Sequence, residues 1–193
     1  MAARTLSVED DPDRRVSLSP TASKRWMMRD GTEVTIRLIS PEDESLMVKF
    51  HHGLSERSVY MRYFESLSLK TRTAHSRLAR ICFADPAQET VVVAVHKDQT
   101  SGEEKILAVG RLSKLPDSKS AEIGTLVADD WQGHGLGTEL VRRMIESARD
   151  QHVSYVSGEI LRDNVVMQSV VKKLGFRLRG FGVQRTVRAT LQL

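Results

Sequence analysis

The sequence predicts a mixed α/β (α+β) fold, in which helices pack on a mostly antiparallel sheet of about seven strands. Three observations predict this class. Short runs rich in β-branched residues recur along the chain. Two segments carry apolar residues at helical spacing. The order of elements also includes a strand–helix–strand unit, which makes its two strands parallel. The 193 residues suit one domain at about 150 residues per domain.

The N-terminal residues predict a tail followed by two strands. Residues 1–24 mix Asp, Arg, Ser and Pro without periodicity, so we expect a disordered tail there and a domain over residues 25–193. Trp26 begins a short strand-like run before the turn signal at Gly31. A β-branched run over residues 34–39 predicts the next strand.

Helices and a three-stranded meander are expected next. Ser40 suits an N-cap and Pro41 suits the first turn, which predicts a helix to about residue 54. Two more helices are expected, over residues 55–64 and 73–81. The antiparallel strands that follow are expected over residues 90–96, 106–113 and 121–127, with turns at Gly102 and Pro116.

A glycine-rich loop over residues 129–137 opens the second half of the chain and leads into an amphipathic helix. We expect Leu140 and Met144 on the apolar face of this helix, and Glu139 and Arg143 on its polar face. The remaining elements are a strand over residues 155–161, a helix capped by Asp163 or Asn164 and ended by Gly175, and strands over residues 176–178 and 183–191.

Composition narrows the classes of function and location. No apolar run approaches the ~18 residues that a membrane helix needs, and the N-terminus is too polar for a secretory signal. We therefore expect a cytoplasmic protein with no membrane partner. Cys82 is the only cysteine, which excludes an internal disulfide, and we expect it in the core or half-buried. The six histidines lack the spacing of metal ligands, so no metal site is expected.

Positive charge is concentrated at the C-terminal end. Six Lys and Arg residues and no acidic residue follow Asp163, although the whole chain has a formal charge of only +4. These charges could attract a phosphorylated cofactor, an acidic protein or nucleic acid, or they could keep an exposed sheet edge soluble. Few aromatic residues lie among them, so the sequence indicates no clear nucleic-acid site.

Three alternating glycines, Gly133, Gly135 and Gly137, lie between a predicted strand and a predicted helix. Glycines let the backbone approach a ligand closely. The first turn of a helix offers unpaired N–H groups and a dipole that favours anions. A phosphate or pyrophosphate is therefore a natural ligand for this loop.

Three other interpretations of the loop compete with that one. A Walker loop ends in Gly-Lys-Ser/Thr, whereas this loop ends in Gly-Thr-Glu. A dinucleotide-binding loop has the pattern Gly-x-Gly-x-x-Gly, but Thr138 occupies the place of its third glycine and Gly137 comes one residue early. The third interpretation is a purely structural turn that packs the helix on the sheet.

The pattern Gln132-x-x-Gly135-x-Gly137 resembles the Gln/Arg-x-x-Gly-x-Gly/Ala motif of the GNAT acetyltransferase superfamily. The strand before it is similar to the fourth strand of that family. Asn164 and the Leu-Gly-Phe run that ends at Phe176 are similar to two later family signatures, at the right separation. The combination of motifs is specific, although no single piece is.

The resemblance extends over roughly residues 29–191. Within the superfamily, three runs resemble the catalytic domain of bacterial Pat-type protein lysine acetyltransferases. They are Asp-Gly-Thr at Asp30, Ser-Pro-Glu-Asp at Ser40 and Ala-Asp-Asp-Trp-Gln-Gly at Ala128.

This resemblance implies acetyl-CoA as the co-substrate. It implies that the strand ending at Val127 splays from the strand over residues 155–161, and that pantetheine bonds to the backbone near Leu126 and Val127. Asn164 would contact the pantetheine arm, a role compatible with capping its helix. The residues implied to bind the rest of the cofactor, with backbone amides on the pyrophosphate, are Gln132, Gly133, His134, Gly135, Leu136, Gly137 and Thr138.

Two glutamates are candidates for the general base. A lysine amine has an ordinary pKa near ~10.4 and arrives charged, so a carboxylate must take its proton, often through water. Glu122 lies where the resembling Pat-type enzymes place their base, and Glu159 matches the glutamate of ribosomal-protein N-terminal acetyltransferases. We favour Glu122, although either side chain could instead face solvent or pair with an arginine. Val171 stands where many GNAT enzymes have a tyrosine that protonates the leaving thiolate.

The sequence thus predicts an N-acetyltransferase that moves an acetyl group from acetyl-CoA to a primary amine, with a protein lysine as the favoured acceptor. Direct attack of the amine on the thioester is expected, with a backbone N–H near Val127 stabilising the oxyanion. Two alternatives stay open: acetylation of a small amine, such as a polyamine or an antibiotic, and a non-catalytic acyl-CoA-binding sensor. The protein is expected to be a monomer or a homodimer.

Overall fold

The computed structural model describes residues 23–117, 119–180 and 185–193. The expected tail falls almost wholly on residues 1–22, and the start of the last expected strand falls on residues 183–184. Both lie outside the described residues.

One sheet of eight strands forms the centre of the described chain, in the order β1-β2-β3-β4-β5-β6-β8-β7. Among these strands β5 and β6 pair in parallel, and every other neighbouring pair is antiparallel. The predicted class is confirmed, with one strand more than the seven expected. The strands are β1 (Lys24–Met27), β2 (Glu33–Leu38), β3 (Glu89–Lys97), β4 (Glu104–Lys114), β5 (Ser120–Val127), β6 (Tyr155–Leu161), β7 (Arg177–Arg179) and β8 (Thr186–Gln192).

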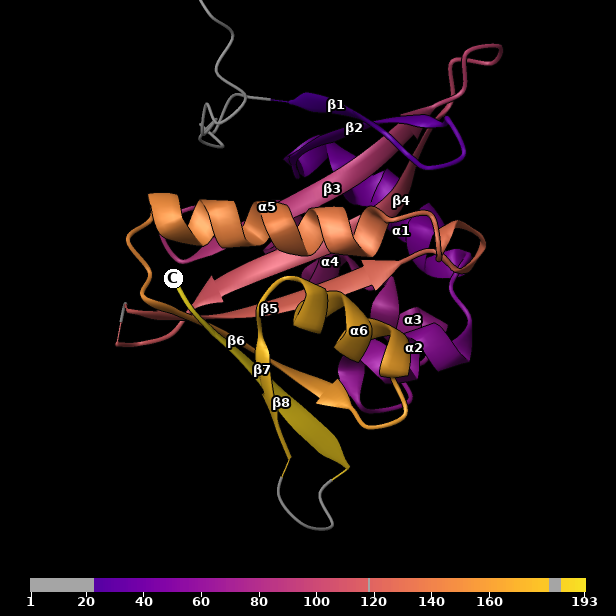
Figure 1. Ribbon diagram of the computed structural model, residues 1–193. Helices are drawn as coiled ribbons and strands as arrows, with labels where there is room; N and C mark the ends of the chain where they lie inside the picture. Colours follow the sequence, from indigo (N-terminus) through magenta and orange to yellow (C-terminus); the bar gives the residue numbers. More distant parts are fainter. Residues whose placement is uncertain (1–22, 118, 181–184) are drawn as a thin grey trace, which may run out of the picture.

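Helices cover both faces of this sheet (Figure 1). On one face lie α5 (Leu136–Asp150) and α6 (Val165–Lys173), and on the other lie α1 (Glu44–His52), α2 (Glu56–Tyr63), α3 (Leu69–Arg72) and α4 (His75–Cys82). The short helix α3 was not expected from the sequence. Its N-cap is Ser68, whose hydroxyl accepts a hydrogen bond from the Thr71 N–H.

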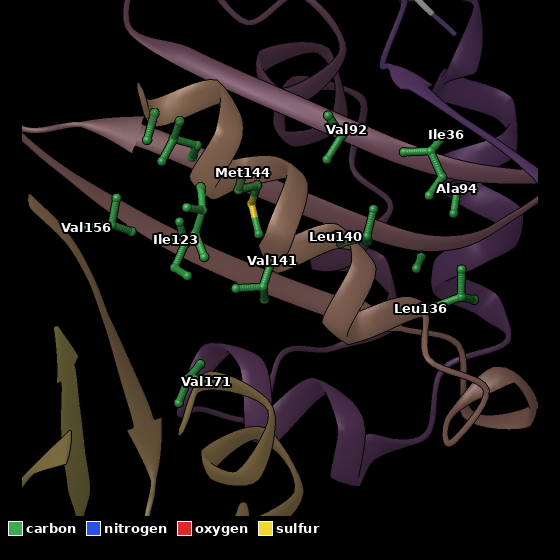
Figure 2. Packing of buried hydrophobic residues seen from close by; sticks show 14 of the residues in the cluster. Ile36, Val92, Ala94, Ile123, Leu136, Leu140, Val141, Met144, Val156 and Val171 are labelled. Carbon is green, nitrogen blue, oxygen red and sulfur yellow. The ribbon is translucent and has the colours of Figure 1, made fainter. Parts of the chain in front are cut away.

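The larger core lies between α5 and the sheet (Figure 2). Leu136, Leu140, Val141 and Met144 project from one side of α5 onto β3, β4 and β5 and are at most 1% exposed. Each such side chain contributes about 1.5–3 kcal/mol when fully buried. Gly110 permits the close approach of the helix, because a Cβ there would lie 3.2 Å from Met144 Sδ. This packing fixes the N-terminus of α5 relative to the end of β5.

The predicted polar face of α5 was wrong at Glu139 and Arg143. Both side chains are buried, and Arg143 Nε donates to Glu139 Oε1 over 2.7 Å. Arg142 donates three further bonds to the same carboxylate, at 2.7 and 2.9 Å from Nη2 and at 3.0 Å from Nε. Two opposite charges at i,i+4 spacing can be buried together because they pair, so neither is left as an unpaired charge inside the protein.

A second core lies beneath α1, α2 and α4 on the opposite face. It contains Met47, Phe50, Val59 and Leu78, and it includes Cys82. Burial raises the pKa of the Cys82 thiol to about 11, with Asp43 and Glu44 acting in the same direction. The expectation of a buried structural cysteine is confirmed.

Candidate functional site

The parallel strands β5 and β6 pair over three residues and then separate. Ser120, Ala121 and Glu122 pair with Tyr155, Val156 and Ser157, and no pairing follows between the described residues of the two strands. From that point β6 pairs only with β8, while β5 stays paired with β4 to its end. The expected splay is therefore present, and it opens a gap in the middle of the sheet.

The register of β5 with β4 decides which backbone groups face this gap. The Ala128 N–H donates to the Leu107 carbonyl, which makes every second residue along β5 a hydrogen-bonded partner of β4. Leu126 is one of these, so its backbone groups point toward β4. Thr125 and Val127 are the alternating residues, so their N–H and C=O groups point into the gap.

The glycine-rich loop follows β5 and leads into α5. Gly133 and Gly135 have φ angles of +83° and +97°, in the left-handed region that favours glycine. Gly135 is the N-cap of α5, so the unpaired N–H groups of the first turn begin at Leu136. A Cβ on Gly135 would lie 3.3 Å from the Trp26 ring of β1.

A cavity of about 550 Å³ extends from this loop along the gap to α6, and we call it the cofactor cavity. Arg29, Arg57 and Lys173 place positive charge on its walls. Val165 and Val166, which are 64% and 71% exposed at the start of α6, give it an apolar rim. Cations beside unpaired amides suit a phosphorylated ligand, and the apolar rim suits its uncharged part.

A hydrogen-bond network around Asp129 joins the loop to α2. Asp129 accepts bonds from the Ser55 N–H at 2.9 Å, the Ser55 hydroxyl at 2.6 Å and the Ser58 hydroxyl at 2.8 Å. Gln132 Nε2 donates to Ser58 Oγ at 3.0 Å and to the Val127 carbonyl at 3.2 Å. Burial raises the pKa of Asp129, but the hydrogen bonds from Ser55 and Ser58 lower it by more. The pKa of Asp129 therefore lies below its ordinary value.

Two of the predicted loop residues use their side chains within the protein. Gln132 is held by the bonds just described. His134 Nε2 lies 3.4 Å from Asp30 Oδ2, which directs its ring toward the turn after β1. That the His134 backbone binds a ligand stays a prediction.

Asn164 is the N-cap of α6. Its side-chain oxygen accepts the Met167 N–H at 3.0 Å. Asn164 also lines the cofactor cavity and the next cavity in the gap, so it caps α6 from the wall of both cavities.

The next cavity, of about 300 Å³, contains both candidate bases, and we call it the acceptor cavity. Glu122 and Glu159 lie on the same face of the sheet, because Glu122 pairs with Ser157, two residues before Glu159. Glu159 lies opposite Arg188 on β8, with 3.8 Å between its Oε1 and Arg188 Nη1. Glu122 is exposed and forms no ion pair within the described part of the chain.

The sequence did not indicate Arg62, Thr125 or Phe64 as site residues. Arg62 lies against Gly124, where an added Cβ would be 2.3 Å from its Nη2, a contact between positions far apart in the chain that no motif marks. Thr125 lines both cavities, and its hydroxyl is buried without a hydrogen-bond partner among the described residues. Phe64 ends α2 with φ +64°, unusual for a bulky residue, and lines the acceptor cavity.

Three further expectations concern Val171, the basic C-terminal residues and membrane helices. Val171 is buried and lines the acceptor cavity, so no hydroxyl lies at that position. Arg177 and Arg179 lie on β7, the exposed edge strand of the sheet. No helix within residues 23–117, 119–180 and 185–193 is long and apolar enough to cross a membrane.

The splayed strands, the glycine loop and the two cavities define an acyltransferase type of site, and comparison with known families agrees. Residues 33–177 match the acetyltransferase (GNAT) domain family. Because this match covers most of the chain, the protein belongs to the GNAT acetyltransferase family.

Relatives of the chain include two proteins named acetyltransferases. It is 26% identical over 174 residues to an acetyltransferase of Pseudomonas aeruginosa, a match that covers 89% of this chain and 90% of that protein. It is 27% identical over 149 residues to the acetyltransferase Pat of Mycolicibacterium smegmatis, covering 77% of this chain and 42% of Pat.

Solved structures share the fold. The GNAT domain of Pat from S. lividans superposes with a TM-score of 0.77 at 21% identity, covering 95% of this chain and 100% of that domain. The protein yncA of Salmonella typhimurium, solved with its cofactor acetyl-CoA, gives a TM-score of 0.60 at 18% identity and covers 82% of this chain and 93% of its own.

Proposed function

We propose that this acetyltransferase moves the acetyl group of acetyl-CoA to a primary amine, and that the amine belongs to a protein lysine. One observation carries the proposal: the gap between β5 and β6 joins a cavity suited to a phosphorylated cofactor to a cavity containing two carboxylates. The thioester would lie where these two cavities meet, beside Thr125 and Asn164.

The cofactor cavity fits the parts of acetyl-CoA in order. The pyrophosphate would accept bonds from the amides of Gly133 to Thr138, with Arg29 and Arg57 adding positive charge. Pantetheine would run along β5 as an extra strand and bond to the backbone of Thr125 and Val127. Leu126 would contribute a lining contact instead, since its backbone groups point toward β4. That yncA holds acetyl-CoA in the same fold supports this assignment.

The transfer needs one proton acceptor and one oxyanion donor. Glu122, directly or through water, would take a proton from the charged amine. The amine nitrogen then attacks the thioester carbon, and a backbone N–H of β5 that faces the gap near Val127 donates a hydrogen bond to the oxygen that becomes negative. The C–S bond then breaks, and the nitrogen loses a second proton to become the amide nitrogen. Water would carry this proton to the thiolate, because Val171 has no acidic group.

The assignment of a lysine acceptor rests on two features. The motifs at Asp30, Ser40 and Ala128 resemble those of Pat-type protein lysine acetyltransferases. Arg62 and Arg111 also line the acceptor cavity, and these cations disfavour a polyamine, which would bring several positive charges close to them. A lysine brings a single charge that Glu122 or Glu159 can accept.

Acetyl transfer with matched glutamate variants tests this proposal. Glu122→Gln should lower kcat by about 10²–10⁴-fold, the usual contribution of a general base, while the affinity for CoA measured by calorimetry stays the same. Glu159→Gln removes the same charge from the same cavity and should cost much less. If kcat instead falls strongly in Glu159→Gln and only slightly in Glu122→Gln, Glu159 is the base. Wild-type protein that binds CoA but acetylates no protein and no amine from a panel would favour the sensor alternative.

A further inference from the structure

A third cavity, of about 170 Å³, lies between the sheet and helices α1, α2 and α4, on the face opposite α5. We call it the arginine cavity, because Arg62, Arg77, Arg80 and Arg111 line it. One water molecule occupies about 30 Å³ of liquid, so the arginine cavity has room for a group larger than a single water.

Positive charge in the arginine cavity has few negative partners. None of its lining residues is acidic. Within the described part of the chain, Arg111 pairs with Glu89, whereas Arg62, Arg77 and Arg80 form no ion pair. Glu122 is near Arg62, but it lines the acceptor cavity instead. Guanidinium groups held this close repel one another unless an anion lies between them.

Tyr63 holds two of these arginines in place without using their hydrogen-bond donors. The guanidinium carbons of Arg62 and Arg77 lie 5.2 and 4.9 Å from the centre of its ring. A cation placed over a ring is attracted by the electrons of the ring, and this attraction needs no N–H hydrogen bond. Burial lowers the pKa of Arg62, and Arg111 and Arg77 lower it further against the opposing effects of Tyr63 and Glu122.

Buried polar atoms in this region also lack partners. His51 is 1% exposed and lines the arginine cavity, and neither of its ring nitrogens has a hydrogen-bond partner among the described residues. The Nε of Arg77 is also buried without a hydrogen-bond partner among the described residues. Buried donors and acceptors in native proteins are nearly always paired, and each unpaired one costs about 1–3 kcal/mol. An anion that accepts from these donors would remove part of that cost.

We propose that the arginine cavity binds a compact anion, a carboxylate or phosphate group, through Arg62, Arg77 and Arg80, with His51 as a further donor. Planar guanidinium groups match both anions because they donate two parallel bonds. Binding would neutralise the repulsion among the arginines and pair their free N–H groups.

The position of the arginine cavity suggests how the anion could matter. Arg62, Arg111 and Gly124 line both the arginine cavity and the acceptor cavity. A bound anion would therefore lie beside the acceptor amine. It could be carried by the acceptor itself, on an acidic or phosphorylated residue near the target lysine, or it could be free inorganic phosphate. The link to the acceptor rests on the proposed function, whereas the anion site does not.

Calorimetric titration with inorganic phosphate tests the site itself. The protein is first saturated with CoA, which occupies the cofactor cavity, and ionic strength is kept constant with sodium chloride. We expect wild type to bind phosphate and Arg77→Gln to bind it at least 10-fold more weakly. Arg149→Gln is the matched control, because Arg149 is exposed and lines none of the three cavities.

The Arg80→Gln variant guards against a folding defect in Arg77→Gln, because Arg80 is exposed and also lines the arginine cavity. If wild type fails to bind phosphate, or if the Arg77 and Arg80 variants bind it as tightly as Arg149→Gln does, the anion site is disproved. Should CoA itself not bind, the same comparison without CoA still tests the anion site, while the proposed function fails separately.

Paired peptides then identify the source of the anion. Each pair contains one lysine and differs by Glu against Gln, or phosphoserine against Ser, within three residues of it. If the acceptor carries the anion, the acidic peptide should have a KM about 10-fold lower at equal kcat, and Arg77→Gln should abolish the difference. If free phosphate is the ligand, phosphate should change the rate for both peptides alike and only in protein with Arg77. An absence of both effects would overturn the link to the acceptor.

Discussion

At the scale of single residues, the site depends on a few polar atoms that the fold leaves available. Thr125 shows this most clearly. This residue lines both the cofactor and the acceptor cavity, and its hydroxyl is buried without a partner among the described residues. A buried hydroxyl without a partner reduces stability in the free protein. It is then available to bond a ligand that enters the gap.

Replacing Thr125 should therefore stabilise the free protein. Thr125→Val keeps the shape of the side chain and removes the unpaired hydroxyl, so we expect the free energy of unfolding to rise by about 1 kcal/mol, measured by urea denaturation. Thr90→Val is the matched control, because the Thr90 hydroxyl accepts a bond from Gln151 Nε2 at 2.9 Å. That variant should destabilise. Equal destabilisation by both variants would mean that the Thr125 hydroxyl has a partner.

His51 makes stability depend on pH. Burial, with Arg77 and Arg72 nearby, lowers its pKa from 6.5 to about 4. The unfolded chain therefore binds the proton more tightly than the folded protein does. The stability that depends on neutral His51 is complete above pH 6.5 and is lost as the pH falls toward 4. At about 1.4 kcal/mol per pKa unit the total loss is ~3 kcal/mol. His51→Leu should remove this part of the acid destabilisation, measured by denaturation from pH 7 to pH 4.5, whereas His52→Leu, at the exposed neighbouring position, should keep it.

At the scale of secondary-structure elements, the Asp129 network fixes α2 against the loop after β5. Ser55 serves as the N-cap of α2 and also bonds Asp129, which lies 74 positions further along the chain. Gln132 extends the network from Ser58 to the end of β5. Two walls of the cofactor cavity, α2 and the loop, are therefore held at a fixed separation.

Removing the Asp129 carboxylate should weaken the attachment of α2 to the loop after β5. For Asp129→Ala we expect a loss of about 2 kcal/mol, since hydrogen bonds to a charged group contribute roughly 1.5–3 kcal/mol, together with weaker CoA binding in calorimetry. Asp130→Ala is a close control, because the adjacent carboxylate is exposed and forms no bond within the described part of the chain. If Asp130→Ala weakens CoA binding as much as Asp129→Ala does, net charge rather than the network explains the effect.

At the scale of the whole molecule, local patterns predicted the elements better than the contacts between them. The strand expected over residues 155–161 matches β6 at both ends, and the Ser40–Pro41 signal correctly placed the start of the first helical segment. Glu139 and Arg143 were misplaced because a helical pattern treats each charge singly and cannot show that two charges pair inside. Arg62 was missed because its importance depends on Gly124, which only the folded sheet brings beneath it.

The glycine-rich loop, which lines the cofactor cavity, packs against Trp26 from a distant part of the chain. A pair of glycine variants tests whether this loop binds the cofactor. Gly135 and Gly102 both have positive φ, so alanine should cost each about 1–2 kcal/mol of stability. Gly102 has open space around it in the turn between β3 and β4, whereas a Cβ on Gly135 meets Trp26 beside the loop. CoA at 100 times its Kd should stabilise wild type and Gly102→Ala by about 2.7 kcal/mol in thermal denaturation. Gly135→Ala should lose most of this stabilisation by CoA. If CoA stabilises the two variants equally, the loop does not bind the cofactor.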